Sequence, residues 1–241
     1  MFWNETKPLN TLKPGPKVAL SLFLILAGIG YLLGFLNILS HYQMVDGTPG
    51  LSIKDVQITY YGSRDKTRLE KTIDASMRGY FATDDDYDAT KSWITDGASE
   101  KVWDSGIKKI FDKSCSTCHS TDAKVAGAVT ETYADVSNYL AQDSGKSWGT
   151  LIQVSHTHVL ATAPLIFILV VILFMTSFPA KFKSAVSIFS LSAVFLDIGS
   201  WWLAKLSPSF AILVMIGGIC LGLSFFLLAV APLYEMWLKK K

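Results

Sequence analysis

The chain has 241 residues, half of them hydrophobic, and a formal net charge of only +2. This balance excludes the strongly basic surface that nucleic-acid binding requires, and it also excludes an acidic interaction tail. Two of the three cysteines share one short motif, so a framework of structural disulfides is excluded as well. The apolar residues gather in long runs, which is typical of a membrane protein.

The first of these runs is uncharged and covers residues 18–40, after a polar segment over residues 1–17. As a helix it would be about 35 Å long at 1.5 Å per residue, enough to cross the roughly 30 Å hydrocarbon core of a bilayer. A secretory signal would have a shorter apolar part and a small-residue cleavage site. We therefore expect an uncleaved membrane anchor.

Residues 41–155 mix charged residues, turn formers and aromatic residues in the proportions of a small soluble domain. We expect three amphipathic helices there: one over residues 67–81, one that begins at the acidic residues 84–86, and one over residues 102–111. The third helix would end close to Cys115.

A Cys-Ser-Thr-Cys-His string follows at positions 115–119. Cys-x-x-Cys-His is the attachment signature of c-type haem: the thiols of Cys115 and Cys118 would add to the two vinyl groups, and His119 would bind the iron. A redox dithiol has no need of the histidine and usually follows a βαβ pattern. A zinc site would need a second ligand pair, and the remaining Cys220 lies in an apolar run. The string predicts covalently attached haem c.

Three further apolar runs cover about residues 158–179, 185–206 and 209–237, joined by short turns. We therefore expect three membrane helices within residues 156–241, each antiparallel to the next. The predicted fold class is all-α: a four-helix transmembrane bundle with a small helical cytochrome c domain, residues 41–155, inserted between the first two helices.

The lysines beside these runs are distributed unevenly. One side holds Lys7, Lys13, Lys17, Lys181, Lys183, Lys239, Lys240 and Lys241, whereas the short segments on the other side hold only Lys205. The positive-inside rule then predicts that both termini are cytoplasmic and that residues 41–155 are periplasmic, at a bacterial cytoplasmic membrane. Haem c is attached on that outer side in bacteria, so the charge pattern and the motif agree.

From Val102 to Ser120 the chain resembles the c-type cytochromes, and more loosely their class I members. The resemblance rests on the amphipathic helix that leads into the Cys-x-x-Cys-His string. It implies haem c linked through Cys115 and Cys118, iron bound by His119, and electron transfer as the activity.

The second iron ligand of class I proteins is usually a methionine some tens of residues after the motif. Here the first methionine after His119 is Met175, within an apolar run. Met77, on the apolar face of the predicted 67–81 helix, is the candidate distal ligand, and Met44 is a weaker one. The alternative for Met77 is a core side chain that fills a gap.

The other histidines lie at the predicted outer membrane surface. His41 ends the first run, and His156 and His158 begin the second. They could bind a b-type haem, reach the haem c iron, hold copper or zinc, or simply cap helix ends. His156 and His158 would point about 200° apart on a helix, so we do not expect them to share one iron. Asp197, inside an apolar run, could orient a ligating imidazole, accept a proton from quinol, or pair with Lys205.

Near the other end of the bundle, Glu235 would be an interfacial charge beside the terminal lysines. Gly217, Gly218 and Gly222 would let another helix or a flat macrocycle approach closely.

These observations predict a membrane-bound c-type cytochrome that transfers electrons at the periplasmic face, as a subunit of a respiratory or photosynthetic complex. Its partners would be membrane lipid, other membrane redox subunits and periplasmic electron carriers, with no nucleic acid. Two alternatives stay open. One is a quinol-oxidising enzyme subunit with an additional haem b in the bundle, and the other is a mainly structural membrane subunit.

Overall fold

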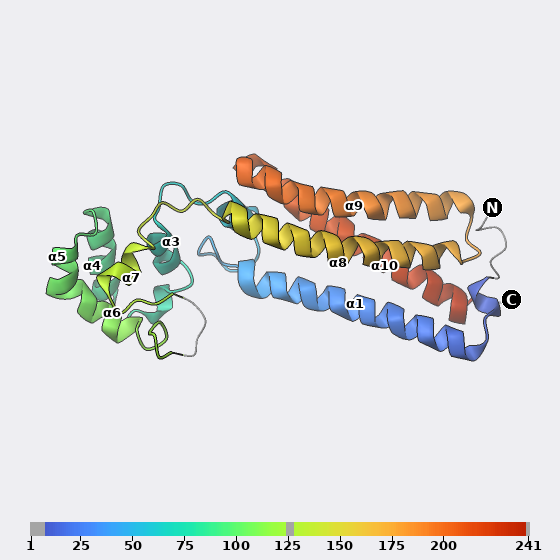
Figure 1. Ribbon diagram of the computed structural model, residues 1–241, viewed down its shortest axis with the longest axis horizontal. Coiled ribbons are helices and arrows are strands. Elements are labelled where there is room, and N and C mark those ends of the chain that lie inside the picture. The colour runs from blue at the N-terminus through green and yellow to red at the C-terminus, as the bar shows by residue number, and fades with distance from the viewer. Residues whose placement is uncertain (1–7, 124–127, 240–241) are drawn as a thin grey trace. The chain divides into compact units, whose positions relative to one another are not determined.

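The computed structural model describes residues 8–123 and 128–239, and the regular elements in these residues are helices (Figure 1). The chain divides into two compact units. One consists of Met1–His41 with Lys146–Lys241, and the other of Tyr42–Gly145. We call them the membrane unit and the loop unit. The predicted all-helical class is confirmed.

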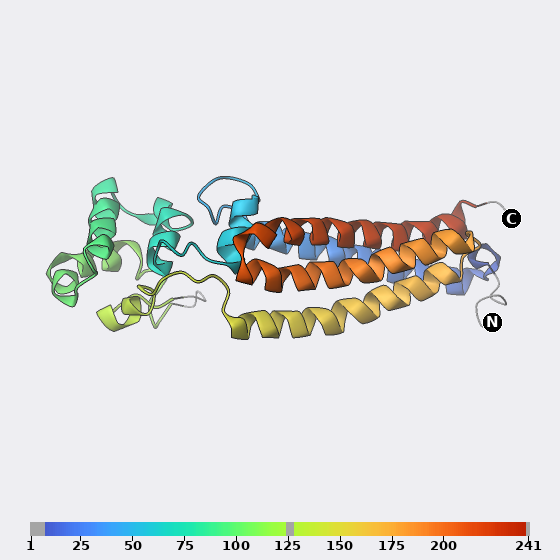
Figure 2. The same ribbon diagram turned by 90° about the horizontal axis from the view of Figure 1, so that it is seen from above.

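The membrane unit contains four long apolar helices: α1 (Pro14–Tyr42), α8 (Trp148–Phe174), α9 (Ala180–Leu206) and α10 (Ala211–Trp237). Among the described residues, these four are long and apolar enough to cross a membrane. Each runs antiparallel to the next (Figures 1 and 2). The short helices η1 (Leu9–Thr11) and η4 (Pro208–Phe210) precede α1 and α10. The four predicted spans are therefore confirmed, and their exposed apolar side chains contact lipid.

Helix α8 begins at Trp148, about ten residues before the apolar run. The hydroxyl of Ser147 accepts a hydrogen bond from the Thr150 N–H at 3.1 Å and caps the helix. The first turns then pack on α9, because the Trp148 and Trp202 rings lie 6.0 Å apart and the Trp202 indole donates to Ser155 Oγ at 3.0 Å. The boundary between the units accordingly lies at 145/146 rather than at 155/156.

Glycines bring the helices of the membrane unit close together. A Cβ at Gly217 would lie 2.7 Å from Asp197 Cα, so the backbones of α9 and α10 touch there. A Cβ at Gly222 would lie 2.5 Å from the Tyr31 hydroxyl of α1. The expected close approach is confirmed at these two positions. At Gly218 a Cβ would meet nothing within 4 Å, although the Gly218 carbonyl accepts from Tyr31 Oη at 3.2 Å.

Glu235 is not the interfacial charge that the sequence predicts. Its side chain is fully buried. It accepts hydrogen bonds from the Leu9 N–H at 3.1 Å, from the Ser177 N–H at 2.7 Å, and from Ser177 Oγ at 2.8 Å. Glu235 therefore joins the segment before α1, the turn between α8 and α9, and the end of α10.

The loop unit is built from short helices. They are α2 (Ile53–Tyr60), α3 (Arg68–Asp74), η2 (Arg78–Tyr80), α4 (Asp84–Thr95), α5 (Glu100–Val102), η3 (Trp103–Ile107), α6 (Lys108–Ser114) and α7 (Tyr133–Ser137). Helices α5, η3 and α6 follow without a break, and η3 is a π-helical turn. They form the third predicted helix. Thr83 caps α4 and three acidic residues fill its first turn, as expected.

The first predicted helix of the loop unit is shorter than the sequence suggests. Helix α3 ends at Asp74, and Ala75 leaves helical geometry with φ −121° and ψ −104°. Asp74 is tied to the surrounding chain by Lys66 Nζ at 2.6 Å, Lys91 Nζ at 3.0 Å and the Tyr87 hydroxyl at 2.7 Å. Burial alone would raise the pKa of Asp74, but these three donors together lower it below its ordinary value.

The core of the loop unit is aromatic. The Trp103 and Phe111 ring centroids lie 4.9 Å apart, and Trp93 lies 5.6 Å from Trp103. The other buried apolar members of this core are Leu69, Ile73, Ile94, Ala98, Ile107 and Val136. This packing gives the loop unit a hydrophobic core of its own.

Two glycines let distant segments of the loop unit meet. Gly145 has φ +69°, and a Cβ there would lie 2.5 Å from the Tyr60 carbonyl oxygen. A Cβ at Gly62 would lie 2.3 Å from the Asp143 carbonyl oxygen. The buried Asp143 carboxylate accepts from the Ser63 and Gly145 N–H groups, at 2.9 and 3.1 Å. The end of α2 and residues 143–145 are thus held in direct backbone contact.

Candidate functional site

The Cys-x-x-Cys-His string forms a compact turn directly after α6. Cys115 is the C-cap residue of that helix, and its carbonyl accepts hydrogen bonds from the N–H groups of Cys118 and His119, at 3.0 and 2.9 Å. The Ser116 N–H still bonds to the Phe111 carbonyl at 2.9 Å. The two thiols and the imidazole are therefore held at the rigid end of a helix that is anchored in the core.

The spacing along this helix explains where the two thiols lie. Trp103, Ile107 and Phe111 are buried and four residues apart, and Cys115 is the next position on the same stripe. Cys115 is half buried and packs against the aromatic core, whereas Cys118 is exposed. One sulfur thus lies against the protein and the other faces solvent, and two thioethers on one edge of a macrocycle could use this arrangement.

The thiol chemistry argues against a redox dithiol. Burial raises the pKa of the Cys115 thiol to about 11. A redox-active Cys-x-x-Cys pair depends on the opposite, a thiol pKa lowered by nearby positive charge or a helix N-terminus. Cys115 instead follows a helix C-terminus, where the dipole disfavours a thiolate. This thiol is protonated at neutral pH.

His119 is held in one orientation by the backbone. Its Nδ1 lies 2.8 Å from the Ala128 carbonyl oxygen, and the Thr130 N–H donates to the His119 carbonyl at 2.8 Å. A carbonyl can only accept, so Nδ1 carries the proton and Nε2 keeps its lone pair. An imidazole held in this way is prepared to bind a metal through Nε2, and the Nδ1 hydrogen bond raises its basicity.

The residues present fit a haem better than a bare ion. Among the described residues, no three His, Cys, Asp or Glu side chains converge to hold a metal ion, and this includes Cys115, Cys118 and His119. Haem c needs no such convergence, because the sulfurs bond to the porphyrin edge and only the imidazole reaches the iron. In addition, Ser116 Oγ is buried here without a hydrogen-bond partner. Such an orphaned polar atom is compatible with a site for a bound group.

The candidate distal methionines lie upstream. Met77 is half buried directly before η2, not on the face of α3 as predicted. Five residues later the Ala82 N–H donates to Ser114 Oγ at 3.4 Å, so the chain after Met77 reaches the end of α6. Met44 is 44% exposed at a residue with φ +65°. Met77 therefore stays the better prediction for a distal ligand.

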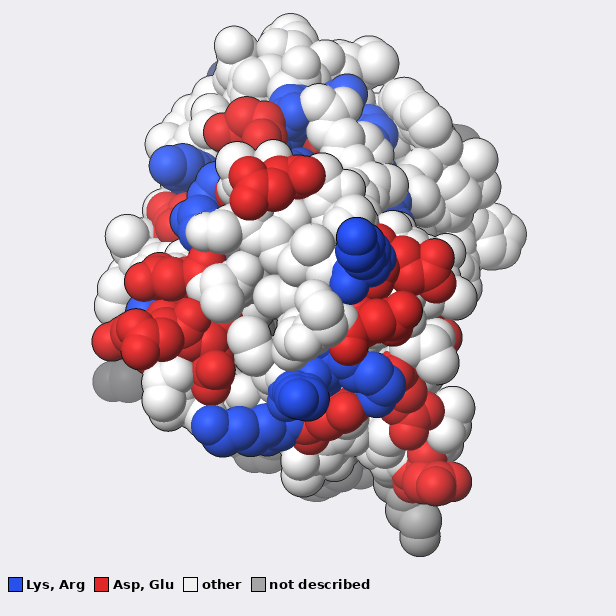
Figure 3. All heavy atoms as spheres, turned by 90° about the vertical axis from the view of Figure 1, so that its left-hand side faces the viewer, with Lys and Arg blue, Asp and Glu red and all other residues white. Residues whose placement is uncertain are grey.

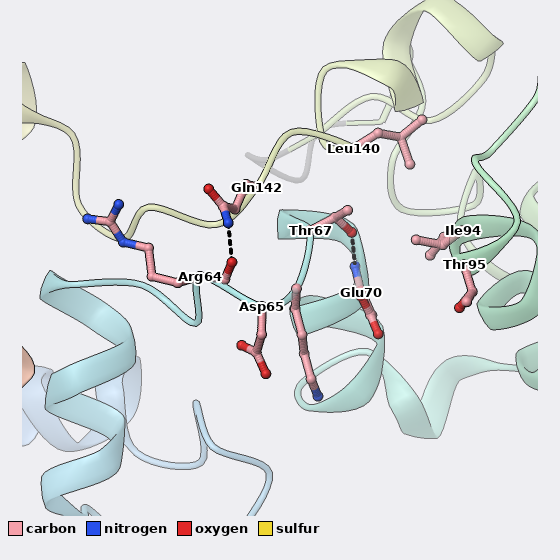
Figure 4. A pocket seen from close by; sticks show the side chains of 9 residues that line it. Arg64, Asp65, Thr67, Glu70, Ile94, Thr95, Leu140 and Gln142 are labelled. Carbon is pink, nitrogen blue, oxygen red and sulfur yellow. Dashed lines mark hydrogen bonds between the residues drawn. The ribbon is translucent and has the colours of Figure 1, made fainter.

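A hollow of about 420 Å³ lies elsewhere in the loop unit, between the start of α3, the end of α4 and residues 140–142 (Figure 4). Its lining is largely polar or charged: Arg64, Asp65, Lys66, Thr67, Glu70, Ile94, Thr95, Leu140 and Gln142. None of the residues 115–119 lines it. A porphyrin requires a mostly apolar lining, so this hollow does not match the candidate site.

The remaining histidines do not form a described group of three that could hold a metal ion. His41 is exposed near the end of α1, with Nδ1 3.0 Å from the Asn37 carbonyl oxygen. His156 and His158 lie in the third turn of α8 rather than at its start. The structure does not gather these three histidines, all of them described, into one metal site.

His158 instead belongs to a different polar cluster. Its ring meets the Trp201 ring edge-on at 5.1 Å between centroids. The Trp201 side chain hydrogen-bonds the carboxylate of Asp197, and Asp197 and His158 are electrostatic neighbours. Asp197 is thus close enough to an imidazole for their charges to interact. Sequence reasoning missed Tyr31, whose hydroxyl also interacts electrostatically with Asp197. The signal was available, because Tyr31 is the one tyrosine in the apolar run over residues 18–40.

Comparison with known proteins supports the membrane character of the chain. A family model for a transmembrane helical domain matches residues 132–241, which include α7 to α10 but not the Cys-x-x-Cys-His string. No curated protein and no solved structure matches the chain. The matched domain and the four apolar helices together make this a multi-pass membrane protein.

Proposed function

We propose that the chain is a membrane-anchored c-type cytochrome that transfers single electrons. Haem c would be bonded to Cys115 and Cys118, with His119 as the proximal iron ligand. The observation that carries this proposal is the orientation of His119: the Ala128 carbonyl binds Nδ1 and leaves Nε2 free, directly beside two thiols at the end of a core helix.

The haem would supply the one-electron couple of its iron, and the protein residues would hold and tune it. The two thioether bonds would fix the macrocycle to the end of α6. His119, made more basic by its hydrogen bond, would stabilise the oxidised iron. The rigid Trp103 and Phe111 rings beneath Cys115 would keep water from that edge.

Charge supports the proposed placement of the loop unit in the periplasm. Within the membrane unit, Lys17 and Lys239 lie at the end of the bundle where Glu235 is buried, since they donate to Met236 O at 2.9 Å and Ser177 Oγ at 2.6 Å. Lys183 lies there too, bonded to the Thr176 carbonyl at 2.9 Å. Lys205 contacts Trp148 at the other end. This asymmetry favours a cytoplasmic location for the lysine-rich end in a bacterial inner membrane.

The composition of the loop unit suits a soluble compartment and a soluble partner. Residues 42–145 contain seventeen acidic and twelve basic residues, so they hold all but three of the acidic residues of the chain. Figure 3 shows side chains of both signs intermixed on the face that it presents. We propose that periplasmic electron carriers and other membrane redox subunits exchange electrons with this unit, with a net basic carrier favoured by charge.

The decisive experiment measures covalent attachment. The full chain is co-expressed with a haem c maturation system and purified, and its intact mass and pyridine haemochrome spectrum are recorded after denaturation. We expect the mass to exceed that of the polypeptide by one haem, with a c-type band in the spectrum. The double variant Cys115→Ala/Cys118→Ala should lose this mass, and Cys220→Ala, the matched control, should keep it. A wild-type polypeptide of unmodified mass would refute the proposal.

A further inference from the structure

Polar side chains from three membrane helices form a cluster in the membrane unit. They are His158 on α8, Asp197 and Trp201 on α9, and Tyr31 on α1. His158 is the first residue of the apolar run of α8, and Asp197 lies within the apolar run of α9. An ionisable group in such a run is costly and marks functional sites in membrane proteins.

His158 is the accessible member of this cluster. Its side chain is exposed on the lipid-facing surface of α8. Its Nδ1 lies 2.7 Å from the Val154 carbonyl oxygen, so Nδ1 carries the proton and Nε2 is left as a hydrogen-bond acceptor. The imidazole therefore offers a proton acceptor to a molecule dissolved in the membrane.

Asp197 interacts electrostatically with this imidazole and is held in place from two sides. The Trp201 side chain bonds its carboxylate, and Gly217 of α10 packs against its backbone. A fixed carboxylate beside an imidazole stabilises the imidazolium that forms when Nε2 takes up a proton. Trp201, which is buried and meets the His158 ring edge-on, limits the directions in which that ring can turn.

We propose that the electron donor is a membrane quinol, which binds from the lipid at His158 and passes its first proton to Nε2. This inference rests on the proposed haem c function, because the electrons need an acceptor. One quinol and two oxidised haems give one quinone, two reduced haems and two protons. A single chain can complete this reaction in two successive one-electron steps, if a downstream carrier reoxidises its haem between them.

The observations favour a quinol over other membrane molecules. The phosphodiester of a phospholipid has no proton to give to a neutral imidazole at neutral pH. A quinol dissolves in the membrane and carries hydroxyl groups that donate to a neutral imidazole. His158 has Ala161 on its own helix, almost one turn further along, and Ala161 is exposed. This small side chain leaves room beside the imidazole for a flat ring.

The test uses the full-length haem-loaded protein in lipid nanodiscs. A decyl-substituted benzoquinol and a naphthoquinol analogue are mixed with the oxidised protein, and haem reduction is followed by stopped-flow absorbance. We expect His158→Phe, which keeps a ring against Trp201, and Asp197→Asn to slow quinol-driven reduction by about 10²-fold or more, the usual contribution of a positioned proton acceptor. Thr157→Val is the matched control. It removes a hydroxyl at the same depth that already bonds to the Gln153 carbonyl, so its rate should equal that of the wild type.

Further measurements separate the two proposals. Dithionite should reduce the haem equally fast in all variants, because it does not use the quinol site. A photoreactive azidoquinone should label α8 or α9, and excess quinone should prevent this labelling. Reduction of the wild type by dithionite but not by quinol would overturn the quinol proposal and leave the cytochrome function intact. Equal quinol rates for His158→Phe and wild type, or an equal loss in Thr157→Val, would also overturn it. If no haem is attached, the cytochrome proposal and this donor role fail together.

Discussion

Replacing Glu235 by leucine should destabilise the membrane unit strongly, because the carboxylate accepts hydrogen bonds from three donors on two otherwise separate segments. Its oxygens accept from the N–H of Leu9, the N–H of Ser177 and the hydroxyl of Ser177, all within 3.1 Å, and the side chain is fully buried. Leucine fills a similar volume but accepts no hydrogen bond. The hydroxyl can rotate to another acceptor, but the two backbone N–H groups cannot.

Each buried donor left without a partner costs about 1–3 kcal/mol, so two N–H groups cost roughly 2–6 kcal/mol. Removal of a buried carboxylate also relieves its own desolvation, which offsets part of this loss. We therefore expect Glu235→Leu to lower the free energy of unfolding by about 2–4 kcal/mol. Glu235→Gln keeps one oxygen that can serve both N–H groups, so its loss should be about 1–2 kcal/mol.

The free energy of unfolding can be measured by titrating SDS into mixed micelles while following far-ultraviolet circular dichroism. Ser177→Ala is the matched control, because it removes only the hydroxyl and should cost about 1 kcal/mol. A Glu235→Leu protein within about 0.5 kcal/mol of the wild type would show that water or other groups satisfy these donors. Glu235 would then not be the link between the segments that it contacts.

Three further predictions concern the loop unit. Gly145→Ala should lower the free energy of unfolding by at least about 2 kcal/mol more than Gly97→Ala, as measured by chemical denaturation of the full chain. Both glycines have positive φ, but only at Gly145 would the new Cβ clash with backbone atoms. Equal losses for the two variants would contradict this clash. The Asp74 pKa is lowered by folding, so its contribution to stability is complete above the ordinary aspartate pKa and is lost as the pH falls through the lowered value. Asp74→Asn should flatten this acid-side decline in a melting series. Phe111→Ala should cost about 3–5 kcal/mol through the cavity it leaves, and a milder effect would mean that the aromatic core can collapse onto the gap.

The parts of the fold that could be predicted depend on signals that accumulate along the sequence. About twenty apolar residues in succession identify each membrane helix, because the transfer energy of the whole run outweighs any single residue. The helix that ends at Ser114 could be predicted for a similar reason, since its buried residues repeat every four positions. The Cys-x-x-Cys-His string could be recognised without knowledge of the fold, because the spacing of its residues alone identifies the haem-attachment signature.

The differences arise where a distant contact decides the local structure. Helix α3 ends at Asp74, whose side chain is held by Lys66, Tyr87 and Lys91, and the four-residue repeat that reaches Met77 cannot show these contacts. Glu235 is buried with hydrogen-bond partners that lie 226 and 58 residues away in the sequence, so the local sequence cannot reveal them. Position in the chain suggested an interfacial charge, and only the tertiary structure shows the donors.

The two histidines of the proposed electron path differ in how much of the fold fixes them. The Nδ1 partner of His158 is the carbonyl four residues earlier in the same helix, a contact that any helical histidine can make. The partner of His119 is a carbonyl nine residues later, so a loop must close to provide it. Each imidazole keeps Nε2 free, and the neighbours decide what Nε2 can do. The thiols beside His119 favour binding of a macrocycle, and the nearby carboxylate of Asp197 favours protonation of His158. Hence the helix alone would preserve the His158 tautomer in most variants of its surroundings, whereas the chemistry of His158 should depend on Asp197.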